Sequence, residues 1–153
     1  MNTIKEIMHT TPLSCRKDES IVAVVNRLFL SEVNFLPVLN ETKEVVGIVT
    51  YQDICLGLGK ALNSKAELKI SEVMNPNIAT VSAFDDEAFA LNVMRTKRLR
   101  SLAVVDQNNK LCGTINFITL ARRILSLKRE LEVISLNRNL PQFEATHFLQ
   151  PLG

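Results

Sequence analysis

The feature that most constrains this chain is an internal repeat. Residues 4–54 align with residues 70–120 without a gap, at a constant offset of 66 positions. The apolar pattern matches throughout, so that Ile4-Lys5-Glu6-Ile7-Met8 falls on Ile70-Ser71-Glu72-Val73-Met74. A fixed period of this kind predicts two copies of one supersecondary unit, each too small to bury its apolar faces alone.

Each copy predicts the same order of elements, β-α-β-β-α. A short apolar strand leads into a helix, which Asp18 or Ser20 can cap in the first copy and Asp85 or Asp86 in the second. The expected buried stripes of these helices are Ile21, Val24, Val25 and Leu28, and Ala88, Leu91 and Met94. Two strands and a second helix follow, with strands over 35–39, 45–50, 101–105 and 111–116, and helices from near Tyr51 and Phe117.

The expected fold class is therefore α/β (or α+β), a tandem pair of β-α-β-β-α repeats packed about a pseudo-twofold axis. Packing of the copies would bury a shared sheet face and leave two related clefts between them. We expect the first repeat over 1–58, a linker over 59–69, the second repeat with a long C-terminal helix over 70–136, and a tail over 137–153.

Charge and composition restrict the function classes. The net charge is only +2, and the basic run over 122–129 is short and mixed, so nothing predicts nucleic-acid binding. No apolar stretch approaches the roughly 20 residues of a membrane helix, and the first residues lack the layout of a signal peptide. The cysteines, Cys15, Cys55 and Cys112, form no CxxC pair, which predicts free, buried thiols in a reducing compartment, the cytoplasm.

The residues that catalysis or metal binding needs are not grouped in the sequence. His9 and His147 are far apart and lack acidic or cysteine neighbours at ligand spacing, so no metal site is predicted. No Ser–His–Asp or Cys–His arrangement and no glycine-rich phosphate loop is evident. We therefore expect a chain that is not an enzyme and requires no cofactor.

Several motifs, at constant offset, carry a resemblance to a known family. They are Ile7-Met8 and Val73-Met74, the strand Leu36-Pro37-Val38, and Gly47-Ile48-Val49-Thr50-Tyr51-Gln52-Asp53. The last reads as Gly, two apolar residues, Thr or Ser, two variable residues and Asp, and we call it the signature. In these motifs the chain resembles the cystathionine-β-synthase (CBS) repeat family, in which paired repeats form a Bateman module. The resemblance covers about residues 3–125.

The resemblance implies a regulatory module that binds an adenosine-containing ligand and acts on a partner protein by conformational change. The ligand would be AMP, ADP, ATP or S-adenosylmethionine, bound in a cleft between the repeats, and the module would be a homodimer. In the family, the signature Asp binds the ribose hydroxyls and the Thr lies near the phosphate. Carried over, the ligand-binding residues are Ile48, Thr50 and Asp53 of the signature, Ile78 and Ala79 along the adenine, and Arg98, Arg100 and Ser101 at the phosphates.

The second copy departs from the signature. It has Asn116 in place of Thr and Thr119 in place of Asp, and the position that matches Arg100 in the first copy is the neutral Asn34. We therefore expect one competent site in each chain, and a second that is weak, altered or empty.

Each of these features also has a structural interpretation. Asp53 fits a helix cap, Thr50 a strand-end hydroxyl, and Arg100 a solvated helix end. The apolar spacing from Phe117 to Ile134 fits either a long helix packed on its own module or a self-association helix. Phe143, Phe148 and Leu149 in the tail could dock on a partner or sister chain. The alternative function is a ligand-free interaction module that dimerises through its repeats and C-terminal helix.

Overall fold

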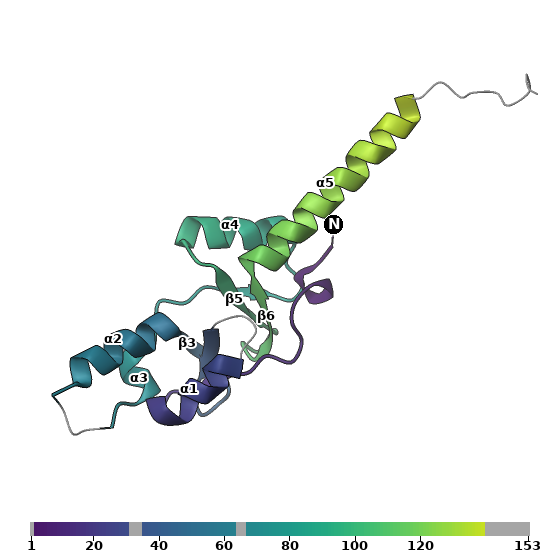
Figure 1. The fold of residues 1–153 in the computed structure, drawn as a ribbon. Helices are drawn as coiled ribbons and strands as arrows, with labels where there is room; N and C mark the ends of the chain where they lie inside the picture. The colour runs from purple at the N-terminus through teal and green to yellow at the C-terminus, as the bar shows by residue number, and fades with distance from the viewer. Residues whose placement is uncertain (1, 31–34, 64–66, 140–153) are drawn as a thin grey trace, which may run out of the picture. The chain divides into compact units, whose positions relative to one another are not determined.

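The predicted order of elements is confirmed in both repeats (Figure 1). The computed structural model describes residues 2–30, 35–63 and 67–139. The first repeat contains β1 (Cys15–Arg16), α1 (Ile21–Leu30), β2 (Phe35–Leu39), β3 (Val45–Thr50) and α2 (Tyr51–Ala61). The second contains β4 (Thr80–Ser82), α4 (Glu87–Lys97), β5 (Ser101–Val105), β6 (Leu111–Asn116) and α5 (Phe117–Asn139). The 3-10 helix η1 (Ile4–Glu6) and the helix α3 (Ile70–Val73) precede these sets.

The two three-stranded sheets have the same pairing. β1 lies parallel to β2 and β4 parallel to β5, whereas β2 with β3 and β5 with β6 are antiparallel. Even the irregularity is repeated, since the register shifts between Val38 and Leu39 in one sheet and between Val104 and Val105 in the other. The fold is therefore a mixed α/β pair of equivalent units, as the sequence predicts.

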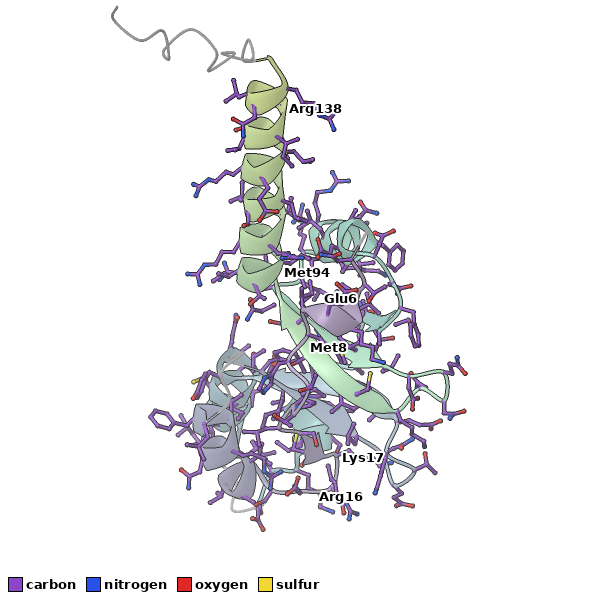
Figure 2. All side chains as sticks on the ribbon, turned by 90° about the vertical axis from the view of Figure 1, so that its right-hand side faces the viewer. Glu6, Met8, Arg16, Lys17, Met94 and Arg138 are labelled. Carbon is purple, nitrogen blue, oxygen red and sulfur yellow. The ribbon has the colours of Figure 1, made fainter. Side chains whose placement is uncertain are left out.

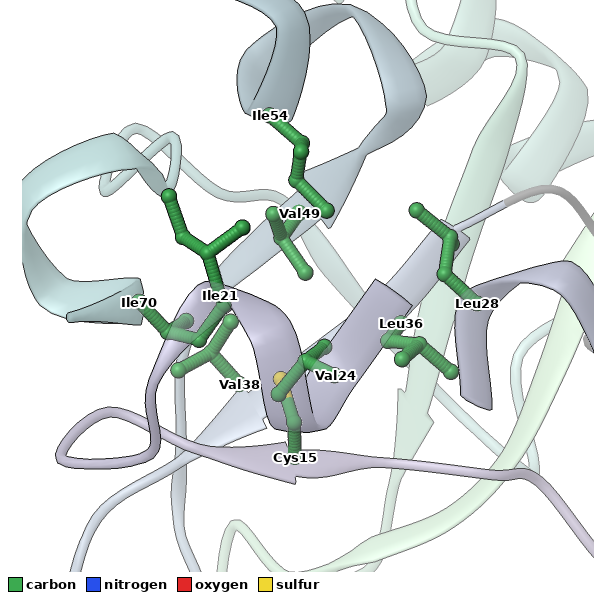
Figure 3. Packing of buried hydrophobic residues seen from close by; sticks show 9 residues of the cluster. All are labelled: Cys15, Ile21, Val24, Leu28, Leu36, Val38, Val49, Ile54 and Ile70. Atoms are coloured by element: carbon green, nitrogen blue, oxygen red, sulfur yellow. The ribbon is translucent and has the colours of Figure 1, made fainter. Parts of the chain in front are cut away.

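The helix α1 forms where an apolar stripe follows a polar cap. Ser20 Oγ accepts a hydrogen bond from the backbone N–H of Ala23 at 3.3 Å, which satisfies a free donor of the first turn. Ile21, Val24 and Leu28 are buried at the spacing that places side chains on one helix face. Figure 3 shows the cluster that they complete, with Cys15, Leu36, Val38, Val49, Ile54 and Ile70.

The helix α4 has a different buried face from the predicted one. Asp86 caps it as predicted, since Asp86 Oδ1 accepts a hydrogen bond from Phe89 N at 2.7 Å. The buried residues are Glu87, Ala90 and Met94, whereas Ala88 is exposed, so the predicted stripe is wrong there. The apolar pattern did not predict this face correctly, because the face includes a charged residue, Glu87.

The first segment of each repeat is hydrogen-bonded to the other repeat. We call residues 4–9 and 70–75 the openers. Four backbone hydrogen bonds at equivalent positions attach them: Ile4 N to Asp85 O (2.9 Å), Lys5 N to Ala83 O (2.8 Å), Ile70 N to Glu19 O (2.9 Å) and Ser71 N to Lys17 O (2.9 Å). Glu44 and its counterpart Lys110 form a bridge with each other. A residue that pairs with its own counterpart lies on the axis that relates the copies, as expected for a pseudo-twofold arrangement.

The helix α5 is continuous from Phe117 to Asn139. Residues up to Ala121 form one compact unit and residues from Arg122 another, so the two are described separately. In the first unit Leu120 is buried, and in the second Leu131, Ile134 and Leu136 are exposed. Within the described residues, no helix is long and apolar enough to cross a membrane. Several predicted features lie outside the described residues: Asn34, part of the linker at 64–66, and Phe143, Phe148 and Leu149 of the tail.

Candidate functional site

The seam between the repeats is closed by two equivalent pairs of backbone hydrogen bonds. His9 N donates to Thr114 O at 2.8 Å and Thr114 N donates to His9 O at 3.1 Å. In the same way Asn75 N donates to Ile48 O at 2.8 Å and Ile48 N to Asn75 O at 3.1 Å. Each pair joins the end of an opener to the signature strand of the opposite repeat. The seam therefore places each signature beside the other repeat's opener.

The glycine that begins each signature permits this close approach. A Cβ atom at Gly47 would lie 2.8 Å from Met74 Sδ and 3.1 Å from Asn75 O. At Gly113 it would lie 2.5 Å from Met8 Sδ, and Figure 2 shows Met8 beside the strand β6. Because interiors are close-packed, a side chain at either position would force the methionine side chain of the opener to move.

The first signature forms a closed hydrogen-bond unit at the start of α2. Asp53 Oδ2 accepts hydrogen bonds from Thr50 N and from Thr50 Oγ1, both at 2.8 Å. Asp53 N in turn donates to Thr50 Oγ1 at 3.3 Å, which completes a capping box. The interpretation of Asp53 and Thr50 as caps is thereby confirmed. Both side chains are half-buried, so the carboxylate is held in place and still reaches solvent.

The second signature keeps this geometry with neutral residues. Asn116 Oδ1 accepts a hydrogen bond from Thr119 N at 2.8 Å, in the manner in which Thr50 accepts from Asp53. Thr119 itself is exposed. The start of α5 therefore presents an amide and a hydroxyl where the start of α2 presents a hydroxyl and a carboxylate.

A cavity of about 330 Å³ lies at the second signature. Its lining comes from both repeats: Ile7, Met8 and His9 from the opener, and Thr114, Ile115, Asn116 and Thr119 from β6 and α5. This volume lies at the lower end of the range that small-molecule pockets occupy. The side that the sequence predicts to be the weaker one thus has room for a ligand.

Ile78 and Ala79 follow the second opener, which is bonded to the first signature at Ile48. Asn75, which bonds Ile48 in both directions, precedes Ile78 by three residues. Ile48, Ile78 and Ala79 are all half-buried. Ile78 packs on a small buried cluster of Val45, Ala103 and Val105, which combines residues of both repeats. These three side chains therefore supply aliphatic surface at the seam.

Arg100 and Ser101 adjoin the second signature through their backbones, and Arg98 lies two residues before Arg100 in the sequence. Arg100 O accepts a hydrogen bond from Phe117 N at 2.7 Å, and Ser101 pairs with Asn116 across β5 and β6. Arg98 ends α4 in the left-handed conformation, with φ of 55°. Among the described residues, no hydrogen bond joins any of the three to Thr50 or Asp53. Their role at the phosphates of the first site stays a prediction.

One wall of the cavity at the second signature comes from the first opener and contains Met8 and His9. The predicted ligand-binding residues do not include these two. The signal that could have identified this wall is the repeat itself. Met8 and Met74 are equivalent positions, and each contacts the glycine that begins the signature of the opposite repeat. Met74 is near Gly47 along the chain, whereas Met8 is far from Gly113. Only the exchange of openers makes these two contacts equivalent.

Two groups whose pKa values are clearly shifted lie away from the seam between the repeats. Burial, and after it the carboxylate of Glu19, raise the pKa of the Cys15 thiol to about 12. Hydrogen bonds from Arg27 lower the pKa of Glu19. The expectation of buried thiols holds for Cys15 and is wrong for Cys55, which lies on the exposed face of α2. In the part of the chain described, no three His, Cys, Asp or Glu side chains are grouped to hold a metal ion.

Comparisons with known proteins agree with this architecture. A family model for the CBS domain matches residues 4–59 and again residues 70–126. Inosine-5'-monophosphate dehydrogenase from Methanocaldococcus jannaschii is 27% identical over 120 residues, which are 78% of this chain and 22% of that protein. The chain spans less than a quarter of the length of the first curated relatives that it matches.

Two solved structures share the fold. One is the CBS domain pair of the protein MJ0100 in complex with 5'-methylthioadenosine and S-adenosyl-L-methionine, with a TM-score of 0.70 and 24% identity. The match covers 82% of this chain and 98% of the MJ0100 chain. The other is CBSX2, a protein of Arabidopsis thaliana, in complex with AMP, with a TM-score of 0.71 and 22% identity over 84% of this chain and 99% of that chain.

Proposed function

This chain belongs to the CBS-domain family, and on that basis we propose that it is a regulatory module that binds an adenosine-containing ligand between its repeats. The ligand is AMP, ADP, ATP or S-adenosylmethionine. The bound adenosine compounds of the MJ0100 and CBSX2 structures support this class. The observation that carries the proposal is the complete signature of the first repeat, whose carboxylate is held by the capping box at the start of α2.

Asp53 is the proposed partner of the ribose hydroxyls. Its Oδ2 atom is engaged by Thr50, whereas its Oδ1 atom accepts no hydrogen bond from the described residues. A carboxylate offers about four lone-pair sites on two oxygens, so Oδ1 can accept from a vicinal diol while the cap persists. Thr50 thereby has two functions, since it begins α2 and orients the carboxylate.

Aliphatic side chains at the seam form the proposed adenine surface. Ile48, Ile78 and Ala79 are apolar and half-buried, and small-molecule sites are lined mostly by apolar side chains. We keep Arg98, Arg100 and Ser101 as proposed phosphate ligands, although their backbone contacts support a place at the second signature.

Regulation follows from the position of the site. A ligand that contacts both repeats has a different affinity for each of their relative arrangements, and it shifts the population toward the one that it binds better. We propose that a partner protein recognises this arrangement and that the chain acts without a catalytic step. Our proposed domain limits remain 1–58, 59–69, 70–136 and 137–153. The proposed compartment is the cytoplasm, where free cysteines such as Cys15, Cys55 and Cys112 persist.

Calorimetric titration with AMP, ADP, ATP and S-adenosylmethionine tests the proposal, with Asp53→Ala and Asp86→Ala as a matched pair. Both carboxylates accept a backbone hydrogen bond at a helix start, so each variant should lose about 1 kcal/mol of stability. Only Asp53→Ala should weaken ligand binding, by about tenfold or more, because it removes a charged acceptor. Equal binding by both variants, or no binding of any of the four compounds to the native chain, would contradict the proposal.

One observation favours the alternative, a ligand-free interaction module that forms homodimers. The second unit exposes Leu131, Val133, Ile134 and Leu136 on a single helix. Exposed apolar residues grouped in this way are typical of association surfaces. A chain that sediments as a dimer and binds none of the four compounds would support this alternative.

A further inference from the structure

The helix α1 has a buried apolar face, and its exposed face is largely apolar as well. Its buried side chains are Ile21, Val24 and Leu28, and Figure 3 shows them within the core cluster of the first repeat. We call the exposed residues of this helix its outer face: Val22, Ala23, Asn26, Phe29 and Leu30. Val22 is 75% exposed, Phe29 77% and Leu30 70%. A surface helix normally presents polar or charged residues to solvent, so the outer face has the composition of a surface that another molecule covers.

The outer face of α1 carries no charge. The one charged residue of the helix, Arg27, lies outside this face and donates hydrogen bonds to Glu19 and to the carbonyl oxygen of Ser14. An apolar surface is stabilised when another apolar surface covers it. A charged partner would instead lose the hydration of its charges without gaining an ion pair. The outer face therefore fits a partner whose own contact surface is apolar and uncharged.

Asn26 is the single polar residue of the outer face and lies at its centre. Val22 and Leu30 are four positions before and after it, and Phe29 is three positions after it, so all three neighbour Asn26 on the helix surface. An amide that an apolar partner covers needs a hydrogen-bond partner of its own. Because an amide has both donor and acceptor groups, a second Asn26 across a twofold axis can satisfy the first reciprocally. A single Asn in an apolar seam fixes the register between helices in coiled coils.

The equivalent face of α4 lacks these properties. At the offset of 66 positions, Val22, Phe29 and Leu30 correspond to Ala88, Arg95 and Thr96. Arg95 is exposed and donates a hydrogen bond to Asn92 Oδ1 at 3.0 Å, so the amide that corresponds to Asn26 is already engaged on its own helix. Two copies of the α4 face brought together would also oppose two cations. The self-complementary surface is therefore a property of the first repeat.

We infer that the outer face of α1 is the surface on which a second copy of this chain docks, with α1 against α1 and Asn26 against its own counterpart. The contact joins first repeat to first repeat, and α4 of both copies stays exposed to solvent. Identical chains most often associate through one surface that meets itself about a twofold axis. None of the residues proposed to bind the ligand lies on α1, so the inference is independent of the proposed ligand.

Sedimentation equilibrium of the full chain tests the surface, with Phe29→Glu and Arg95→Glu as a matched pair at equivalent positions. We expect the native chain to form a dimer. Phe29→Glu should weaken this dimer at least about tenfold, because it removes an apolar anchor and places a carboxylate in the contact. Arg95→Glu should leave the dissociation constant within about twofold of the native value. Both side chains are exposed, so both variants should keep the circular dichroism spectrum of the native chain.

A disulfide tests the twofold arrangement. Asn26→Cys and its control Asn92→Cys are each combined with Cys55→Ser, which removes the exposed native thiol. Oxidation by diamide joins two thiols where their Cβ atoms approach to about 3.5–4.5 Å. Non-reducing electrophoresis should therefore show a covalent dimer for Asn26→Cys and a monomer for Asn92→Cys.

Four outcomes would overturn the inference. A native chain that sediments as a monomer at every concentration would refute the association itself. An undiminished dimer in Phe29→Glu would place the contact on another surface, and equal weakening by Arg95→Glu would extend it to the second repeat. A weakened dimer in Phe29→Glu without a disulfide in Asn26→Cys would show that a different surface of the second copy covers α1. The calorimetric titration measures ligand binding separately, so none of these outcomes decides the proposed function.

Discussion

Arg27 donates two hydrogen bonds to Glu19, from Nη1 to Oε2 and from Nη2 to Oε1, each at 2.9 Å. The same Nη1 also donates to the carbonyl oxygen of Ser14 at 2.9 Å. One guanidinium group thereby joins the helix α1, the turn before it and the residue that precedes β1. Bidentate geometry of this kind makes an ion pair stronger than a typical surface pair.

The first prediction concerns this ion pair. The side chains are 34% and 25% exposed, so a double-mutant cycle of Arg27→Ala and Glu19→Ala should give a coupling of about 0.5–1 kcal/mol in urea unfolding at pH 7. Arg27 lowers the pKa of Glu19, so this stability is present above the ordinary pKa and is lost as the pH falls through the folded value. A coupling that persists unchanged well below that pKa would contradict the assignment.

The exposed pair Arg16–Asp18 is the matched control. It has a similar distance, 3.0 Å, but its side chains are 59% and 56% exposed. The same cycle on Arg16 and Asp18 should give a clearly smaller coupling, because solvent and salt screen exposed charges. Added salt should reduce it further.

The second prediction uses two glycines of α2 that differ only in their surroundings. A Cβ atom at Gly57 would lie 2.2 Å from Val73 Cγ1, whereas nothing lies within 4 Å of one at Gly59. Gly57→Ala should lower the free energy of unfolding by about 1–3 kcal/mol, because a branched side chain on the opposite repeat's opener must move. Gly59→Ala should raise it by up to about 1 kcal/mol through helix propensity. Equal effects would show that α3 does not pack closely on α2.

The third prediction concerns the reactivity of the cysteines. Cys55 is exposed, whereas Cys15 is buried with its pKa raised to about 12. Because the thiolate is the reactive form, iodoacetamide at pH 8 should label Cys55 rapidly and Cys15 only after unfolding. Peptide mass spectrometry at timed intervals gives both rates. Labelling of Cys15 at the rate of Cys55 in the folded chain would be incompatible with this packing.

The fourth prediction is an alkaline loss of stability from the same thiol. The folded pKa of Cys15 is raised from 9.0 to about 12, so its contribution is complete below the unfolded value and is lost as the pH rises from about 9 to about 12. Urea unfolding at pH 8 and pH 10.5 should show the loss in the native chain. Cys15→Ala should be less stable at pH 8, since a buried group is removed, and should show a weaker decline with pH.

The fifth prediction tests the exposed helix of the second unit. If Leu131 and Ile134 contribute to self-association, replacing both by Glu should weaken the proposed homodimer at least about tenfold in sedimentation equilibrium, because two buried apolar anchors are lost. Arg129→Glu introduces a negative charge at an exposed polar position of the same helix and should have a much smaller effect. An unchanged dimer in the Leu131/Ile134 variant would assign association to the repeats alone.

The sequence predicted the elements well because two copies constrained each other. The strands over 35–39 and 45–50, and their counterparts in the second copy, begin and end at the predicted residues. The face of α4 could not be predicted, because the buried Glu87 contradicts the apolar pattern that defines a stripe. The helix cap at Asp53 was one of two interpretations, and only the distances to Thr50 show that the cap is formed.

The composition of the candidate site was harder to predict, because it depends on contacts between distant segments. The constant offset between the copies identifies equivalent positions, but it does not state which repeat an opener joins. The contact of Met8 with Gly113, and so the cavity beside Thr114, follows from backbone hydrogen bonds that a pattern of apolar residues does not encode. For the same reason, the sequence grouped Arg100 with Asp53, whereas the sheet pairs its neighbour Ser101 with Asn116.

The swapped attachment of residues 4–9 and 70–75 has a consequence for how the chain could be divided. A fragment that ends before residue 64 would contain the first opener but not β6, to which that opener is bonded. It would also contain β3 but not the second opener, which is bonded to β3. The complementary fragment would have the reverse deficiency. Two separately expressed halves should therefore fold poorly alone and recover the native arrangement when mixed.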